Sequence, residues 1–177
     1  MTMTSRELWT VIHGMGFGSL FLLAFAGGLA GLYSLRPEWV TVSGLHERIR
    51  RLTAGTWLMA IAAWGTVLTG TWIVYPWYRA KPPAGLTELN DYPRYFLLAD
   101  EKLADWHHFA MEWKEHVAWF APIMATVVAF IVFRYRKNLP EMPFLRNALI
   151  YTFLVAFATA AIAGALGAFI TKAAPLM

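Results

Sequence analysis

Four long stretches of the chain contain no Asp, Glu, Lys or Arg, and they dominate its pattern of hydrophobic and polar positions. These uncharged stretches cover residues 8–35, 52–78, 117–133 and 147–171. A helix needs about 20 residues to cross the hydrocarbon layer of a bilayer, and three of the stretches exceed that length. The third is shorter, and we expect the neighbouring residues Trp113, Glu115 and His116 to extend it into the membrane interface.

The pattern predicts an all-α fold, a four-transmembrane-helix bundle with a long outer loop that contains short surface helices. We expect one integral membrane domain over residues 1–177. The predicted spans lie at about 8–35, 52–78, 115–135 and 147–171, and the outer loop at 79–114. Asp100 is the expected N-cap of a helix that continues into the third span. The first apolar run is too long for the core of a signal peptide, so we expect it to be retained.

Composition supports a membrane environment and narrows the possible chemistry. Hydrophobic residues make up 58% of the chain, and its mean hydropathy is +0.47. The absence of cysteine excludes disulfides, thiolate metal sites, iron–sulfur clusters and covalently attached c-type haem. The net charge of +4 does not indicate nucleic-acid binding, because the basic residues flank apolar spans, where membrane topology explains them.

The distribution of Lys and Arg predicts the orientation of the bundle. The connections at 36–51 and 134–146 together hold eight basic and three acidic residues, a net charge of +5. The opposite side, with both termini and the long loop, holds seven basic and eight acidic residues, a net charge of −1. The positive-inside rule therefore predicts that the N- and C-termini lie outside, in a bacterial inner membrane. Small residues at four-residue spacing, Gly14 with Gly18 and Gly27 with Gly31, predict close helix packing, as do Gly164 and Gly167.

Histidines supply the candidate chemistry. In the predicted topology His46 is cytoplasmic, whereas the other four gather at the outer end. His13 lies on the first span, His116 begins the third, and His107 and His108 precede it. Ionisable groups at membrane depth are costly, and they usually mark function.

The main hypothesis is one b-type haem held by His13 and His116. Low-spin haem takes two imidazoles from opposite faces, and facing helices of a bundle can supply them. Gly14 and Gly16 flank His13 and are expected to leave room for the porphyrin. The aromatic residues expected to surround the ring are Trp9, Phe17, Trp113, Trp119 and Phe120.

Other interpretations of the histidines stay open. His108, Glu112 and His116 are spaced i, i+4, i+8 on one helix, with His107 beside them and His13 as a further ligand, and could bind copper, zinc or non-haem iron. The spacing matches no protease motif. A third interpretation is a cofactor-free structural subunit, in which His13 is a packing residue and His116 pairs with Glu112.

Four spans, with His13 on the first and His116 on the third, resemble the small four-helix membrane b-type cytochromes that serve larger redox complexes as anchors or electron-transfer subunits. The resemblance is architectural. Known members with two haems carry two histidine pairs, whereas spans two and four of this chain have no histidine. The resemblance implies an electron-transfer subunit with haem b, whose partners are the lipid bilayer, other membrane or periplasmic redox subunits and quinone. Glu112 or Glu115 would then accept protons.

Overall fold

The computed structural model describes residues 3–39 and 41–174, and these residues form helices and connecting turns with no strand. Within this described part, four helices are long and apolar enough to cross a membrane. We call them spans one to four: Ser5–Ser34, Gly44–Tyr78, Glu101–Tyr135 and Pro143–Ala173. The all-α fold with four long apolar helices that could span a membrane is therefore confirmed, as expected of an integral membrane protein.

Shorter elements make up each span. Span one consists of α1 (Ser5–Val11), η1 (Ile12–Gly16) and α2 (Phe17–Ser34). Span two consists of α3 (Val42–Thr69), η3 (Gly70–Val74) and α4 (Tyr75–Tyr78). Span three consists of α6 (Glu101–Glu112), η4 (Trp113–Val117) and α7 (Phe120–Tyr135), and span four is α8 (Pro143–Ala173). The connecting segments contain η2 (Pro37–Trp39), α5 (Pro93–Leu98) and η5 (Leu139–Glu141).

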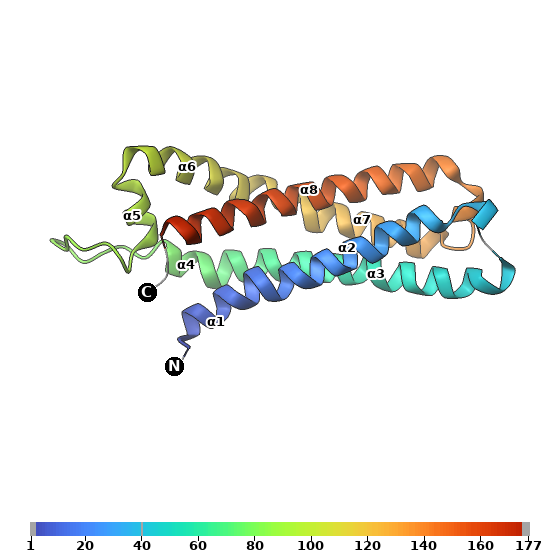
Figure 1. Ribbon diagram of the computed structural model, residues 1–177, viewed down its shortest axis with the longest axis horizontal. Coiled ribbons are helices and arrows are strands. Elements are labelled where there is room, and N and C mark those ends of the chain that lie inside the picture. Colours follow the sequence, from blue (N-terminus) through green and yellow to red (C-terminus); the bar gives the residue numbers. More distant parts are fainter. Residues whose placement is uncertain (1–2, 40, 175–177) are drawn as a thin grey trace.

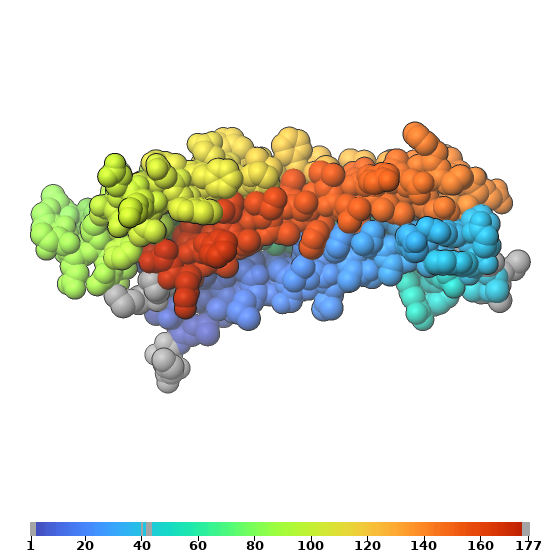
Figure 2. Space-filling model, turned by 45° about the horizontal axis from the view of Figure 1, so that its top comes forward, coloured from blue at the N-terminus to red at the C-terminus, as the bar shows by residue number. Residues whose placement is uncertain are grey.

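The spans form an elongated up-and-down bundle (Figure 1). The two ends of the chain and α5 lie at one end, which we call the termini end, and the two short connections lie at the other. Span one packs mainly against spans two and four, and span three packs mainly against the same two. Spans one and three are therefore diagonal neighbours. Figure 2 shows α8 lying between α6 on one side and span one on the other.

Span three is longer than predicted. Its helix begins at Glu101, where the Asp100 carboxylate accepts hydrogen bonds from the backbone N–H groups of Lys102 (2.9 Å) and Leu103 (3.1 Å). The predicted N-cap and the continuous helix are thus both present. A helix of 35 residues is roughly 52 Å long, against about 30 Å for the hydrocarbon layer. The connection between spans two and three therefore covers residues 79–100 rather than 79–114.

Aromatic side chains fill the space between spans one and four. The ring of Phe25 stacks on Phe157, with centroids 4.0 Å apart, and lies 5.4 Å from Phe153. Gly28 makes this packing possible, since a Cβ there would lie 2.8 Å from the Phe153 ring. Gly27, which the sequence pattern places at a helix contact, is instead exposed with open space beside it.

Two arginines donate hydrogen bonds to the last carbonyls of span one, at the end of the bundle opposite the termini. Arg48 Nη1 donates a 2.9 Å hydrogen bond to the Ser34 carbonyl, and Arg146 Nη1 donates one of 2.9 Å to the Leu35 carbonyl. The last carbonyls of a helix have no partner within the helix, so both bonds satisfy groups that would otherwise be left unpaired. Arg146 is itself only 8% exposed. Positively charged side chains at a helix C-terminus are also favoured by the helix dipole.

Candidate functional site

Each of the first three spans contains a π-helical turn at the termini end of the bundle. In η1, η3 and η4 the closing backbone bond joins residues five apart: Phe17 N–H to the Ile12 carbonyl, Tyr75 to Gly70, and Ala118 to Trp113. Such turns insert one residue into an α-helix, and they are frequent at functional sites. η1 contains His13 and η4 contains His116, so both predicted haem ligands lie in distorted helix.

His13 is directed towards span two. Its Nδ1 lies 2.9 Å from the Thr66 carbonyl and 3.3 Å from Thr69 Oγ1. Because a carbonyl can only accept, Nδ1 carries the proton, and the lone pair of the neutral ring is on Nε2. A backbone carbonyl that holds Nδ1–H in this way is the usual orienting partner of a metal-ligating histidine.

Gly70 is the residue that admits the His13 ring. A Cβ at residue 70 would lie 2.6 Å from His13 Cε1 and 3.4 Å from Nε2. Gly14 and Gly16, which were predicted to leave room for a porphyrin, are both exposed on span one, with no side chain of another span within 4 Å of a Cβ placed there. The close approach to the His13 ring therefore comes from Gly70 of span two.

His116 lies on the outer surface of span three. Its Nδ1 is 3.2 Å from the Glu112 carbonyl and 3.3 Å from the Glu112 carboxylate, as the packing interpretation expects. The exposed fractions of the two side chains are 68% and 77%. His13 is directed inward to span two, so the structure does not bring the two predicted ligands together.

The aromatic residues predicted to line the cofactor separate in the same way. Trp113 is half-buried, and its Nε1 donates a 3.2 Å hydrogen bond to the Thr159 carbonyl of span four. Phe120 is 55% exposed on span three. Trp113 therefore packs span three against span four, whereas Phe120 belongs to the surface of the bundle.

The alternative metal site has no supporting geometry. Among residues 3–39 and 41–174, no group of three or more His, Cys, Asp or Glu side chains is placed to hold a metal ion. His116 and Glu112 form a pair, His108 is exposed, and His107 is buried.

His107 belongs to a row of aromatic rings at the termini end. Its ring stacks on Tyr78 with centroids 5.8 Å apart, and Tyr78 stacks on Tyr75 at 6.5 Å. The Tyr75 hydroxyl donates a hydrogen bond to the Glu115 carboxylate. Both nitrogens of His107 are buried and have no hydrogen-bond partner within the described part of the chain. The row joins the ends of spans two and three.

Lys114 is the residue of this region that the sequence analysis missed. It is only partly exposed, and Nζ lies 3.4 Å from the Ala163 carbonyl of span four. A Cβ at Gly167 would lie 2.9 Å from Nζ, so that glycine leaves space for the ammonium. Gly70 was also missed. The signal available for it was the spacing of two threonines and a glycine, Thr66, Thr69 and Gly70, within an otherwise apolar span.

The termini end thus combines three π-helical turns, an inward histidine and a partly enclosed lysine ammonium. Ionisable side chains within membrane-spanning helices are rare and are usually functional. Comparison of the chain with protein-family models, with curated proteins and with solved structures gives no match.

Proposed function

We propose that this protein is a b-type cytochrome subunit that transfers electrons within a larger membrane redox complex, with His13 as an axial ligand of the haem. The observation that carries the proposal is the hydrogen bond from His13 Nδ1–H to the Thr66 carbonyl. It fixes the imidazole in the tautomer with the Nε2 lone pair, which is the form that binds iron. Thr69 and Gly70 support this orientation from the same face of span two.

Both histidines have the tautomer that suits haem iron, but only His13 is directed into the bundle. The Glu112 carbonyl engages His116 Nδ1, so this ring has the same tautomer and its Nε2 lone pair is available. Its outward position, however, does not pair it with His13 across the bundle. Bound haem would supply reversible one-electron transfer. The role of the chain is to orient the imidazole and to keep the site within the apolar bundle.

An optical spectrum tests the proposal. We expect the purified protein to show a Soret band, and after reduction the α-band of a b-type haem. Replacement of His13 by alanine should abolish both, because it removes the ligand held by Thr66. His46→Ala is the matched control, since His46 is exposed on the opposite end. A colourless wild-type protein after expression with excess haem would reject the proposal.

The same spectrum assigns the second ligand. If His116 is the sixth ligand, His116→Ala should convert a low-spin spectrum to a high-spin one and leave haem bound by His13. If His13 is the only histidine ligand, the wild-type spectrum should already be high-spin, and His116→Ala should not change it.

A quinol is the electron donor that this subunit would use. Quinol oxidation releases protons, so an acceptor is needed near the site. Glu115 is exposed and accepts a hydrogen bond from Tyr75, three residues before the end of span two. The carboxylate is therefore fixed at the termini end, on the same part of span three as Lys114 and His116. The haem and the site of quinol oxidation would both lie at the termini end.

The proposed location is a bacterial inner membrane with the termini end in the periplasm. The supporting observation is charge, since eight of the 15 Lys and Arg residues flank the opposite end. A C-terminal alkaline phosphatase fusion should therefore be active in cells. As a control, a fusion within the connection at 134–146 should be inactive. The reverse pattern would invert the orientation.

A further inference from the structure

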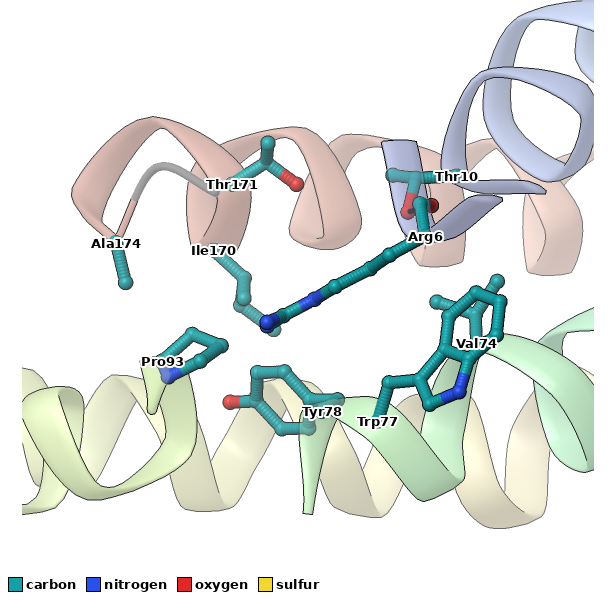
Figure 3. Close-up of a pocket in the computed structure, with 9 residues that line it drawn as sticks. All are labelled: Arg6, Thr10, Val74, Trp77, Tyr78, Pro93, Ile170, Thr171 and Ala174. Carbon is teal, nitrogen blue, oxygen red and sulfur yellow. Dashed lines mark hydrogen bonds between the residues drawn. The ribbon is translucent and has the colours of Figure 1, made fainter. Parts of the chain in front are cut away.

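A small cavity lies at the termini end, beside but separate from His13. Its volume is about 60 Å³, and spans one, two and four and α5 all contribute to its walls. The lining residues are Arg6, Thr10, Val74, Trp77, Tyr78, Pro93, Ile170, Thr171 and Ala174. Figure 3 shows the Arg6 side chain crossing the cavity from span one, so that its guanidinium ends near Tyr78 and Ile170.

Two hydrogen-bond donors of this cavity have no partner within the described residues. They are Arg6 Nη2 and the Tyr78 hydroxyl, and both atoms are buried. The other terminal nitrogen of Arg6, Nη1, donates a long 3.4 Å bond to the Asp91 carbonyl. A buried polar group without a partner destabilises the folded protein, and a charged group does so more strongly. A bound acceptor would remove both costs at once.

The chemistry of the walls selects an anion. Thr10 donates its hydroxyl hydrogen to the Arg6 carbonyl (2.9 Å) and Thr171 donates to the Gly167 carbonyl (3.0 Å). Arg6 Nη2 and the Tyr78 hydroxyl are therefore the buried side-chain donors of the lining that have no partner within the described residues. Within the part of the chain that the structure describes, no carboxylate forms an ion pair with Arg6. A guanidinium in a partly enclosed cavity is best compensated by an anionic oxygen group, and phosphate suits its planar fork.

Size excludes a large ligand. On the scale by which one water needs about 10–15 Å³, a cavity of about 60 Å³ holds a group of a few non-hydrogen atoms and no fused ring system. The cavity also lies where spans two and four end, close to Trp77 and Tyr78, the residue types that mark the level of lipid head groups. We infer that this cavity binds a phosphate group, with Arg6 and Tyr78 as its donors.

The test is a binding titration followed by thermal unfolding. Delipidated protein in a neutral detergent is titrated with short-chain phosphatidylglycerol in one arm and with inorganic phosphate in the other. A ligand that binds only the folded protein raises the unfolding temperature with its concentration, which gives an apparent Kd. We expect Arg6→Gln to raise that Kd at least tenfold, as for loss of a charge-assisted hydrogen bond. Tyr78→Phe, which removes one hydroxyl, should raise it several-fold.

Arg79→Gln is the matched control, because Arg79 is exposed at the same end and does not line the cavity. Stabilisation by both ligands, reduced in Arg6→Gln and Tyr78→Phe only, supports a phosphate site that free phosphate can also enter. Stabilisation by the lipid alone supports a head-group site. No stabilisation of the wild type, or equal losses in Arg6→Gln and Arg79→Gln, overturns the inference. The readout is unfolding, so it does not depend on whether the protein binds haem.

Discussion

Replacing Gly70 by valine should displace His13 and, in the proposed cytochrome, prevent haem binding. A Cβ at residue 70 would lie 2.6 Å from His13 Cε1 and 3.3 Å from Nδ1, and valine adds two further methyl groups. The imidazole must then leave the Thr66 carbonyl, which fixes its tautomer. We expect haem content per protein, measured after extraction into pyridine, to fall at least tenfold. Overpacking should also lower the free energy of unfolding by about 1–3 kcal/mol.

Gly164→Val is the control for this variant. Gly164 lies on span four, and a Cβ there would meet nothing within 4 Å. The two substitutions add the same atoms to an apolar helix, so a difference between them reports on the contact with His13. If Gly70→Val retains the wild-type haem content and spectrum, His13 is not a ligand in the orientation described. If it also retains wild-type stability, the close packing of the ring on span two is wrong.

Replacing Lys114 by methionine should make the protein more stable. Methionine keeps most of the length of the side chain but removes an ammonium whose hydrogen-bond acceptor, the Ala163 carbonyl, is 3.4 Å away. A charge within a membrane helix is costly, and apolar replacements of buried charges are often stabilising. We expect a gain on the order of 1–2 kcal/mol, measured by thermal unfolding in detergent. In the proposed cytochrome, the gain should come with a changed reduction potential, because the lost positive charge lies in η4, at the same end of the bundle as His13.

Lys102→Met is the matched control for Lys114→Met. Lys102 is exposed in the first turn of the same span, and its loss should leave both stability and potential unchanged. A strong loss of stability in Lys114→Met would mean that the ammonium has an essential structural partner. An increase in stability without a change in potential would separate Lys114 from the haem.

The spans were predictable because each depends on a property that is local in sequence. A run of uncharged residues of sufficient length can cross a bilayer only as a helix, and Asp100 carries a recognisable N-cap signal. The start of span three was the exception. Residues 101–114 were predicted to be helical and to continue into the apolar segment, as they do, but they are polar enough that they were counted with the outer loop rather than with the span.

The arrangement around His13 was not predictable, because it depends on helix rotation. Periodicity shows that His13 and His116 lie near one end of the bundle, but not which way each side chain points. The π-helical turns make this harder, since each changes the direction of every side chain beyond it. The packing of the His13 ring against Gly70 and the enclosure of Lys114 by span four are contacts between spans. Neither contact leaves a motif in the sequence.

The two arginines at the end of span one contribute both to membrane topology and to the hydrogen bonding of a helix end. Arg48 and Arg146 count towards the charge bias that directs membrane insertion, and they also hold the last carbonyls of a helix. During synthesis, Arg146 is made 111 residues after Leu35. The Leu35 carbonyl can therefore form this hydrogen bond only when span four begins to form. Insertion of spans three and four would therefore supply the last hydrogen bond at the end of span one. A chain interrupted before residue 146 would lack the Arg146 bond, and the Leu35 carbonyl would lose this partner.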